Sequence, residues 1–173
     1  MQYYVYGPYE MAREDGGLAI SRRRDDKKAF WAAVDQGEKG LPEACGCYVL
    51  VIRGVAWYVG LAAAQGFRQE IFQHHKLLLY SEALRKVGGR AQFIFIAKAT
   101  PSDRFSKPSK NGHRDIRWLE QLLIGLAIVR NDGLRNIKDT KLLREMHVPG
   151  IINSNQGEGR ATSVQALRRA VGV

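Results

Sequence analysis

Short apolar runs rich in β-branched and aromatic side chains predict three β-strands. Residues 46–52 (GCYVLVI) and 55–60 (VAWYVG) have this composition, and the pair Arg53-Gly54 between them is a turn signal. We therefore expect these two strands to form an antiparallel hairpin. Residues 91–99 (AQFIFIAKA) predict the third strand.

Other segments place apolar residues at helical spacing. Residues 21–36 carry Phe30, Trp31 and Val34 on one helical face, and Gly37 is a plausible end for this helix. Further helices are predicted over residues 67–80, 81–87, 115–131, 139–146 and 161–170. Asp115 is suited to cap the start of the longest of them.

The order of these elements predicts an α+β fold with a small antiparallel sheet of about three strands, flanked by helices. The length of 173 residues fits one main domain. We divide the chain into an N-terminal arm and basic helix (1–44), a central domain (45–155) and a C-terminal tail with a short helix (156–173). Residues 1–20 are expected to form an extended arm, or a short strand, that packs on the central domain.

Composition adds one unusual property, a formal net charge of +10 from 27 Lys and Arg against 17 Asp and Glu. Such an excess attracts polyanions, and nucleic acid is the commonest of them. The densest positive cluster is a candidate nucleic-acid-binding patch, made by Arg22, Arg23, Arg24, Lys27 and Lys28. A solvated basic surface without a specific partner explains the same cluster equally well.

The two cysteines, Cys45 and Cys47, are expected to be small buried side chains rather than zinc ligands, which would need two further donors such as His74 and His75. Free thiols fit a reducing compartment. The N-terminus lacks the features of a signal peptide, and no segment approaches the roughly 20 apolar residues of a membrane span. We therefore expect a cytoplasmic protein without a membrane partner.

Two charged residues fall on apolar helix faces. Glu120 has Ile116, Leu123 and Ile124 as its helical neighbours. An isolated buried charge costs several kcal/mol unless it is paired, hydrogen-bonded or bound to metal. Arg68 likewise lies on the apolar side of its predicted helix, where it could hold a phosphate or extend its stem along the core. The two residues could share one site, or neutralise each other without catalysis.

Taken with the hairpin, these residues form a recognisable series. The tripeptide G-C-Y ends at Tyr48, Y-V-G begins at Tyr58, Arg68 starts the next helix, Glu120 lies on a later helix and Asn153 is near the end. This series, over roughly residues 45–155, resembles the GIY-YIG nuclease superfamily.

The resemblance implies a metal-dependent endonuclease that hydrolyses phosphodiester bonds, with DNA as the expected substrate. Glu120 would bind a single Mg²⁺ or Mn²⁺, and Tyr48 would act on the water nucleophile. Tyr58 would line the site, Arg68 would stabilise the phosphate charge, and Asn153 would tie the tail to the site. Ionising a free tyrosine at pH 7 costs about 4 kcal/mol. The alternative is therefore a neutral Tyr48 beside a metal-activated hydroxide.

Two positions depart from the pattern. Leu61 stands where many family members have a polar residue, and Phe72 stands where many have His or Tyr. His75, one turn further along the predicted helix, is a candidate to replace the missing proton carrier. The departures support a second hypothesis, a nucleic-acid-binding module on the same fold with little or no activity. A third is a basic interaction protein that resembles the family only in structure, in which Arg68 and Glu120 form a closed salt bridge and no cleft lies beside Tyr48.

Overall fold

The sheet has four antiparallel strands. The computed structural model describes residues 1–172, apart from the side chains of residues 137–139 and 142. The strands are β1 (Gln2–Glu10), β2 (Gly46–Ile52), β3 (Val55–Ala62) and β4 (Ala91–Ala99), in the spatial order β1-β4-β2-β3. The α+β class is confirmed, but the expected three strands are too few.

The additional strand is β1, which lies in the predicted arm. It pairs with β4 from Gln2 to Glu10, with an irregular register between Tyr6 and Tyr9. Gly7 and Pro8 fall in that gap and weaken the strand signal in the sequence. Proline is tolerated there because β1 lies at an edge of the sheet, where one row of backbone groups needs no partner strand.

The helices follow the predicted order with shifted limits. They are α1 (Arg24–Gly37), α2 (Phe67–Glu70), α3 (His74–Val87), α4 (Arg114–Arg130), α5 (Ile137–Glu145) and α6 (Thr162–Val171), with short 3₁₀ helices η1 (Leu41–Glu43) and η2 (Glu158–Arg160). No helix in the part of the chain described is long and apolar enough to cross a membrane.

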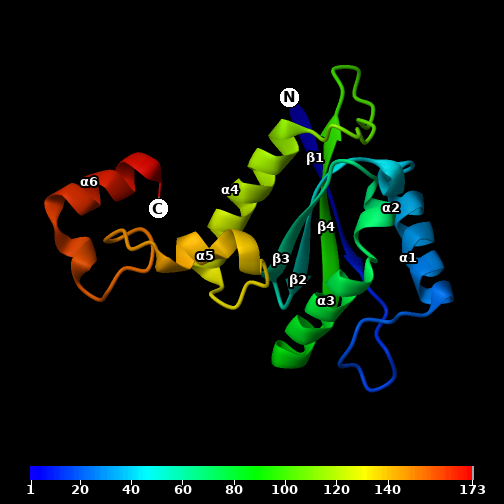
Figure 1. Ribbon diagram of the computed structural model, residues 1–173, viewed down its shortest axis with the longest axis horizontal. Helices are drawn as coiled ribbons and strands as arrows, with labels where there is room; N and C mark the ends of the chain where they lie inside the picture. The colour runs from blue at the N-terminus through cyan, green and yellow to red at the C-terminus, as the bar shows by residue number, and fades with distance from the viewer. Residues whose placement is uncertain (173) are drawn as a thin grey trace.

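Helices cover both faces of the sheet. On one face, Tyr48 and Leu50 of β2 align with Phe95 and Phe93 of β4, and these side chains form the main core with α1, α2 and α3. On the other face, α4 packs against β2 and β3 (Figure 1). Residues 156–172, including α6, extend away from the sheet beyond α5 (Figure 1).

The hairpin that carries both tyrosine motifs forms as predicted. Arg53 and Gly54 have φ angles of 53° and 72°, which suit a two-residue turn with positive φ at both central positions. The register places Tyr48 opposite Gly60 and Leu50 opposite Tyr58. Both tyrosine side chains therefore lie on the face covered by α1, α2 and α3.

The single helix predicted over residues 67–80 is wrong, because the chain breaks it at residues 71–73. α2 ends at Glu70, and a new helix begins at His74 and continues to Val87 through the boundary predicted at residue 80. Ile71 is fully buried at the break. The interruption changes the helical phase, so Arg68 and His75 do not share one face.

Asp115 has a different role from the predicted helix cap. His113 occupies the cap position of α4 and makes no side-chain cap hydrogen bond. Asp115 instead accepts hydrogen bonds from the Tyr3 hydroxyl at 2.7 Å and from Lys98 Nζ at 2.9 Å. These bonds join β1, β4 and the first turn of α4, and they hold the pKa of Asp115 below its usual value although partial burial alone would raise it.

Candidate functional site

Tyr48 lies at the centre of the aromatic core. Its side chain is fully buried, and its ring centroid is 6.2 Å from that of Tyr58 and 5.8 Å from that of Phe93. A Cβ atom on Gly60 would overlap the hydroxyl end of the Tyr48 ring. Tyr48 of G-C-Y and Gly60 of Y-V-G therefore pack against each other across the hairpin.

The environment of Tyr48 favours its neutral form. Burial raises the pKa of Tyr48 well above its ordinary value, and the neighbouring Tyr80 and Tyr58 raise it further. The hydroxyl oxygens of Tyr48 and Tyr80 are buried, and among the described residues neither makes a hydrogen bond of good geometry, although the two hydroxyl groups interact with each other. In this conformation Tyr48 is unsuited to be a general base in contact with solvent.

A buried ion pair, absent from the predicted site, lies against this cluster. Lys76 of α3 is 5% exposed and pairs with Glu70 of α2. Its Nζ also lies 5.4 Å from the centroid of the Tyr48 ring. Lys76 faces inward because α3 starts anew at His74, a change of phase that a continuous helix does not predict.

Arg68 lies on the same side of the sheet but is directed toward α1. Its Nε donates to Glu43 Oε1 at 2.5 Å, and its guanidinium lies 5.4 Å from the Trp31 ring. The ion pair that the third hypothesis requires, between Arg68 and Glu120, is replaced by this pair with Glu43. The Arg68 side chain remains 43% exposed, so a phosphate could still reach it.

His75 is exposed on α3 rather than buried on an apolar face. The expectation that it shares a helical face with Arg68 is wrong, because the break at residues 71–73 puts the two residues on different helices. His74 is exposed as well.

Glu120 is half-buried on α4, which covers the face of the sheet opposite to Tyr48. Ile116 and Ile124, one turn to either side, are buried as predicted. Burial and the negative charge of Glu120 raise the pKa of the Cys47 thiol, so the carboxylate lies near the start of β2. Glu120 therefore approaches the sheet near Cys47 of β2, and the structure does not bring it together with Tyr48, Tyr58 and Arg68 on the opposite face.

Asn153 does not tie the tail to the tyrosine cluster. Its Nδ2 donates to the carbonyl oxygens of Leu143, Arg144 and Met146 at 2.8, 3.0 and 2.7 Å. Two of these carbonyl groups belong to the last turn of α5, and the third is the first carbonyl beyond the helix. Asn153 thus caps the end of α5, with a left-handed φ of 48°.

The expected contact to the hairpin comes instead from Asn136. Its Oδ1 accepts from the Val59 N–H at 2.9 Å, and its Nδ2 donates to the Val59 carbonyl at 2.6 Å. Asn136 is 5% exposed, and Val59 is the middle residue of the Y-V-G tripeptide. An asparagine just before a helix predicts a cap for that helix, so no local pattern pointed to a bond with the strand.

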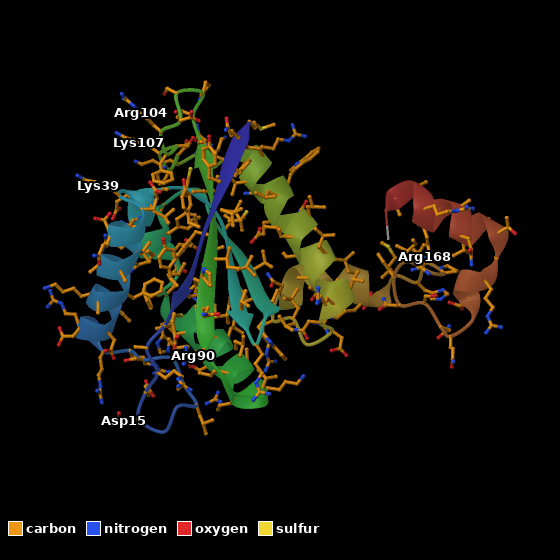
Figure 2. The ribbon with its side chains drawn as sticks, turned by 180° about the vertical axis from the view of Figure 1, so that it is seen from behind. Asp15, Lys39, Arg90, Arg104, Lys107 and Arg168 are labelled. Atoms are coloured by element: carbon orange, nitrogen blue, oxygen red, sulfur yellow. The ribbon has the colours of Figure 1, made fainter. Side chains whose placement is uncertain are left out.

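The predicted basic patch is partly neutralised. Arg23 pairs with Asp15 at 2.7 Å, and Arg22 lies 4.0 Å from Glu14. Lys27 lies 5.4 Å from the Phe72 ring, which packs against the core. Arg24 and Lys28 are exposed on α1. At the opposite end of α1, Arg104 and Lys107 project from the loop after β4, near Lys39 (Figure 2).

The cysteines are free and buried, as expected. Their thiols donate to the carbonyl oxygens of Ser106 and Ile116. Burial raises the pKa of Cys45 to about 11, so neither cysteine is a reactive thiolate at neutral pH.

Within the described residues, no group of three or more His, Cys, Asp or Glu side chains converges as a metal cage. A single carboxylate does fit Mg²⁺, which usually keeps several waters and takes its other ligands from the substrate. Glu120 is half-buried rather than sealed in the core, and this position suits such a site.

Models of known protein families, characterised proteins and solved structures were compared with this chain, and none matches it.

Proposed function

We propose that this protein is a metal-dependent endonuclease of the GIY-YIG type, which hydrolyses phosphodiester bonds of nucleic acid, with DNA as the expected substrate. The site would lie along β3, at the edge of the sheet. Both cysteines are free thiols, which fits action in the cytoplasm.

One observation carries this proposal: three separate parts of the chain organise the Y-V-G segment of β3. Tyr48 packs against Gly60, Asn136 binds both backbone groups of Val59, and α4, the helix that carries Glu120, packs against the same strand. An exposed loop or a solvated strand would not need so many fixed contacts. Such rigid support is what a catalytic site requires of its scaffold.

Each candidate residue then has a limited role. Glu120 would hold one divalent cation, which when bound supplies Lewis-acid chemistry and lowers the pKa of a water. Tyr48 would remain neutral and fix the position of Gly60 and Tyr58. Tyr58 lies across the sheet from α4, so it would support β3 rather than line a site at Glu120. Arg68 contacts Glu43 and Trp31 of α1 on the Tyr48 face of the sheet, so it would not contact a phosphate held by a cation at Glu120.

A second candidate is a nucleic-acid-binding module with little activity. The burial of the Tyr48 hydroxyl and the direction of Arg68 toward Glu43 favour it. The net charge of +10 supports binding in either case.

Cleavage of supercoiled plasmid DNA in the presence of Mg²⁺ separates the two. We expect the wild-type protein to produce nicked or linear DNA, and Glu120→Gln to produce neither. Glu145→Gln, an exposed acidic residue at the end of α5, removes the same charge as a matched control and should cleave as wild type. Intact plasmid with the wild-type protein, together with salt-dependent binding, would favour the module.

A further inference from the structure

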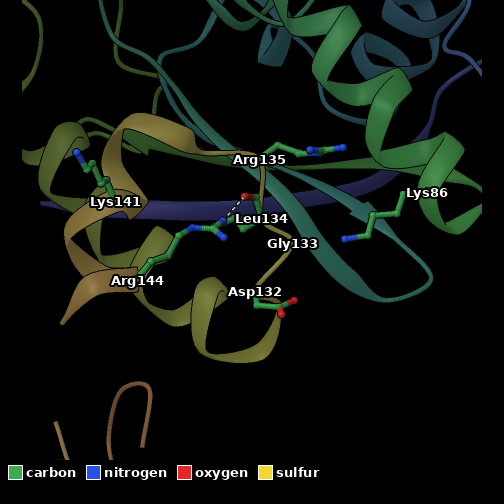
Figure 3. A pocket seen from close by; sticks show the side chains of 7 residues that line it. All are labelled: Lys86, Asp132, Gly133, Leu134, Arg135, Lys141 and Arg144. Carbon is green, nitrogen blue, oxygen red and sulfur yellow. Dashed lines mark hydrogen bonds between the residues drawn. The ribbon is translucent and has the colours of Figure 1, made fainter. Parts of the chain in front are cut away.

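A basic pocket lies beside β3, in a part of the molecule that the resemblance does not assign. It has a volume of about 490 Å³ and lies between the end of α3, the loop after α4, and α5 (Figure 3). Volumes of this size are typical of ligand sites. Its charged lining residues are Lys86, Asp132, Arg135, Lys141 and Arg144.

Positive charge predominates in this pocket. Among the charged lining residues whose side chains the structure describes, four are cationic and one, Asp132, is acidic. Glu82 of α3 lies nearby and pairs with Arg135 at 3.6 Å. Even if Glu82 is counted, the cations exceed the carboxylates by two, so an anion is the ligand that this pocket suits.

The pocket is supported by the fold rather than formed by loose surface chains. Lys86 Nζ lies 5.7 Å from the centroid of the Trp57 ring, which is 7% exposed. A Cβ atom on Gly133 would come within 3.1 Å of Trp57 Cζ3 and 3.2 Å of Lys86 Nζ. Gly133 therefore lets the loop pass close to both side chains, and Lys86 points across the pocket toward it (Figure 3).

The arginines are held from the other side. Arg144 donates from Nη2 to the Leu134 carbonyl at 2.8 Å and from Nε to Thr140 Oγ1 at 3.2 Å (Figure 3 shows the first bond). The Arg135 backbone N–H donates to the Trp57 carbonyl at 2.9 Å. The loop is thus fixed to β3 at Trp57 and again at Val59 through Asn136.

We infer that this pocket binds a backbone phosphate of the nucleic acid whose cleavage is proposed above. Trp57 immediately precedes Tyr58 on β3 and contacts Lys86 and the pocket loop, so a strand lying along this edge could reach both the pocket and the Y-V-G segment. The inference rests on the proposed function only for the identity of the ligand. Arginine and lysine are the side chains that bind phosphate, and a phosphodiester backbone offers a phosphate at each nucleotide.

The test measures binding of a short fluorescent DNA duplex in EDTA at several salt concentrations, so that cleavage plays no part. The double variant Lys86→Gln, Lys141→Gln should bind about tenfold more weakly at ~0.1 M salt for each phosphate that it no longer neutralises. Its slope of log K against log salt should fall by about 0.9 for each such phosphate. The double variant Lys39→Gln, Arg90→Gln removes two exposed charges elsewhere and should change the slope less (Figure 2 labels both).

Replacing Lys86 could disturb its contact with Trp57, so a second variant changes Lys141 to Gln alone. Lys141 is exposed, and this variant should fold as the wild type does. Wild-type affinity and slope in both pocket variants would overturn the inference, whether or not the protein cleaves DNA. If inorganic phosphate raises the melting temperature of the wild type through these lysines but DNA binding is unchanged, the pocket binds free phosphate and the inference also fails. Weakened DNA binding without any cleavage would support the pocket and refute the nuclease.

Discussion

At the scale of single residues, the pairing of Tyr48 with Gly60 explains why the two tripeptides occur together. Glycine is required at position 60 because the ring of Tyr48 occupies the space of its side chain. The register then places the Tyr58 ring beside Tyr48. The tyrosines are therefore structural neighbours before any chemistry is considered.

Replacing Gly60 with alanine should destabilise the protein by about 1–3 kcal/mol, because the added methyl group overpacks the core against Tyr48. Chemical unfolding measures the change. Gly125→Ala is the matched control, since a Cβ atom there meets nothing within 4 Å. Alanine inside a helix should stabilise α4 by about 0.5–1 kcal/mol. Equal stability of Gly60→Ala and the wild type would contradict the packing described for Tyr48.

The buried tyrosines also predict how stability depends on pH. Burial raises the pKa of both Tyr48 and Tyr80, whereas in the unfolded chain these groups ionise near pH 10. Above that pH the unfolded state loses protons that the folded state keeps. The free energy of unfolding should therefore be constant with respect to these groups below pH ~10, and fall by about 1.4 kcal/mol per pH unit for each tyrosine above it.

Tyr48→Phe should reduce this alkaline slope by about 1.4 kcal/mol per pH unit. It should change stability near pH 7 by less than about 1 kcal/mol, because the hydroxyl makes no hydrogen bond of good geometry in the described structure. Urea unfolding at pH 7, 9.5 and 10.5 measures both effects. An unchanged alkaline slope would mean that Tyr48 ionises as readily in the folded protein as in the unfolded chain.

At the scale of elements, local patterns predicted the hairpin, β4, α1 and α4, because their periodicity and turn residues agree with their environment. The break between α2 and α3 was not predictable, since residues 67–80 keep an apolar face on a continuous helical wheel. Tertiary packing of Ile71 overrides that local preference. Because the helix was predicted to continue unbroken to residue 80, His75 was wrongly expected on the apolar face, and the burial of Lys76 was not predicted.

For Glu120 the sequence predicted the surroundings, since Ile116 and Ile124 on its helical face are buried, whereas its role as a metal ligand stays a prediction. The contact to the hairpin that was expected of Asn153 is made by Asn136, which the sequence did not indicate because partners distant in sequence leave no local pattern. Asn136→Ala should cost about 1–3 kcal/mol, as it leaves the buried Val59 N–H and carbonyl without partners. Hydrogen exchange at the Val59 amide should accelerate in this variant.

Asn153→Ala is the informative comparison, because it removes hydrogen bonds to carbonyls at the end of α5 only. We expect a loss of about 1 kcal/mol and normal protection of the Val59 amide. The same loss of protection in both variants would show that Asn136 has no specific role at β3.

At the scale of the whole molecule, composition predicted a strongly basic protein, but not where the charge would be organised. The predicted patch on α1 is partly paired with Glu14 and Asp15, whereas the basic pocket beside Trp57 combines residues from three distant segments. The molecule thus presents a candidate cation ligand, Glu120 on α4, and a candidate phosphate pocket beside β3, the strand against which α4 packs.

Manganese binding followed by electron paramagnetic resonance is the most direct measurement of the central claim, that Glu120 holds a divalent cation for phosphodiester hydrolysis. We expect the wild-type protein to bind one Mn²⁺ and Glu120→Gln to lose that binding, while Glu145→Gln retains it. Identical Mn²⁺ binding by the wild type and Glu120→Gln, or none by either in the presence of DNA, would contradict the account.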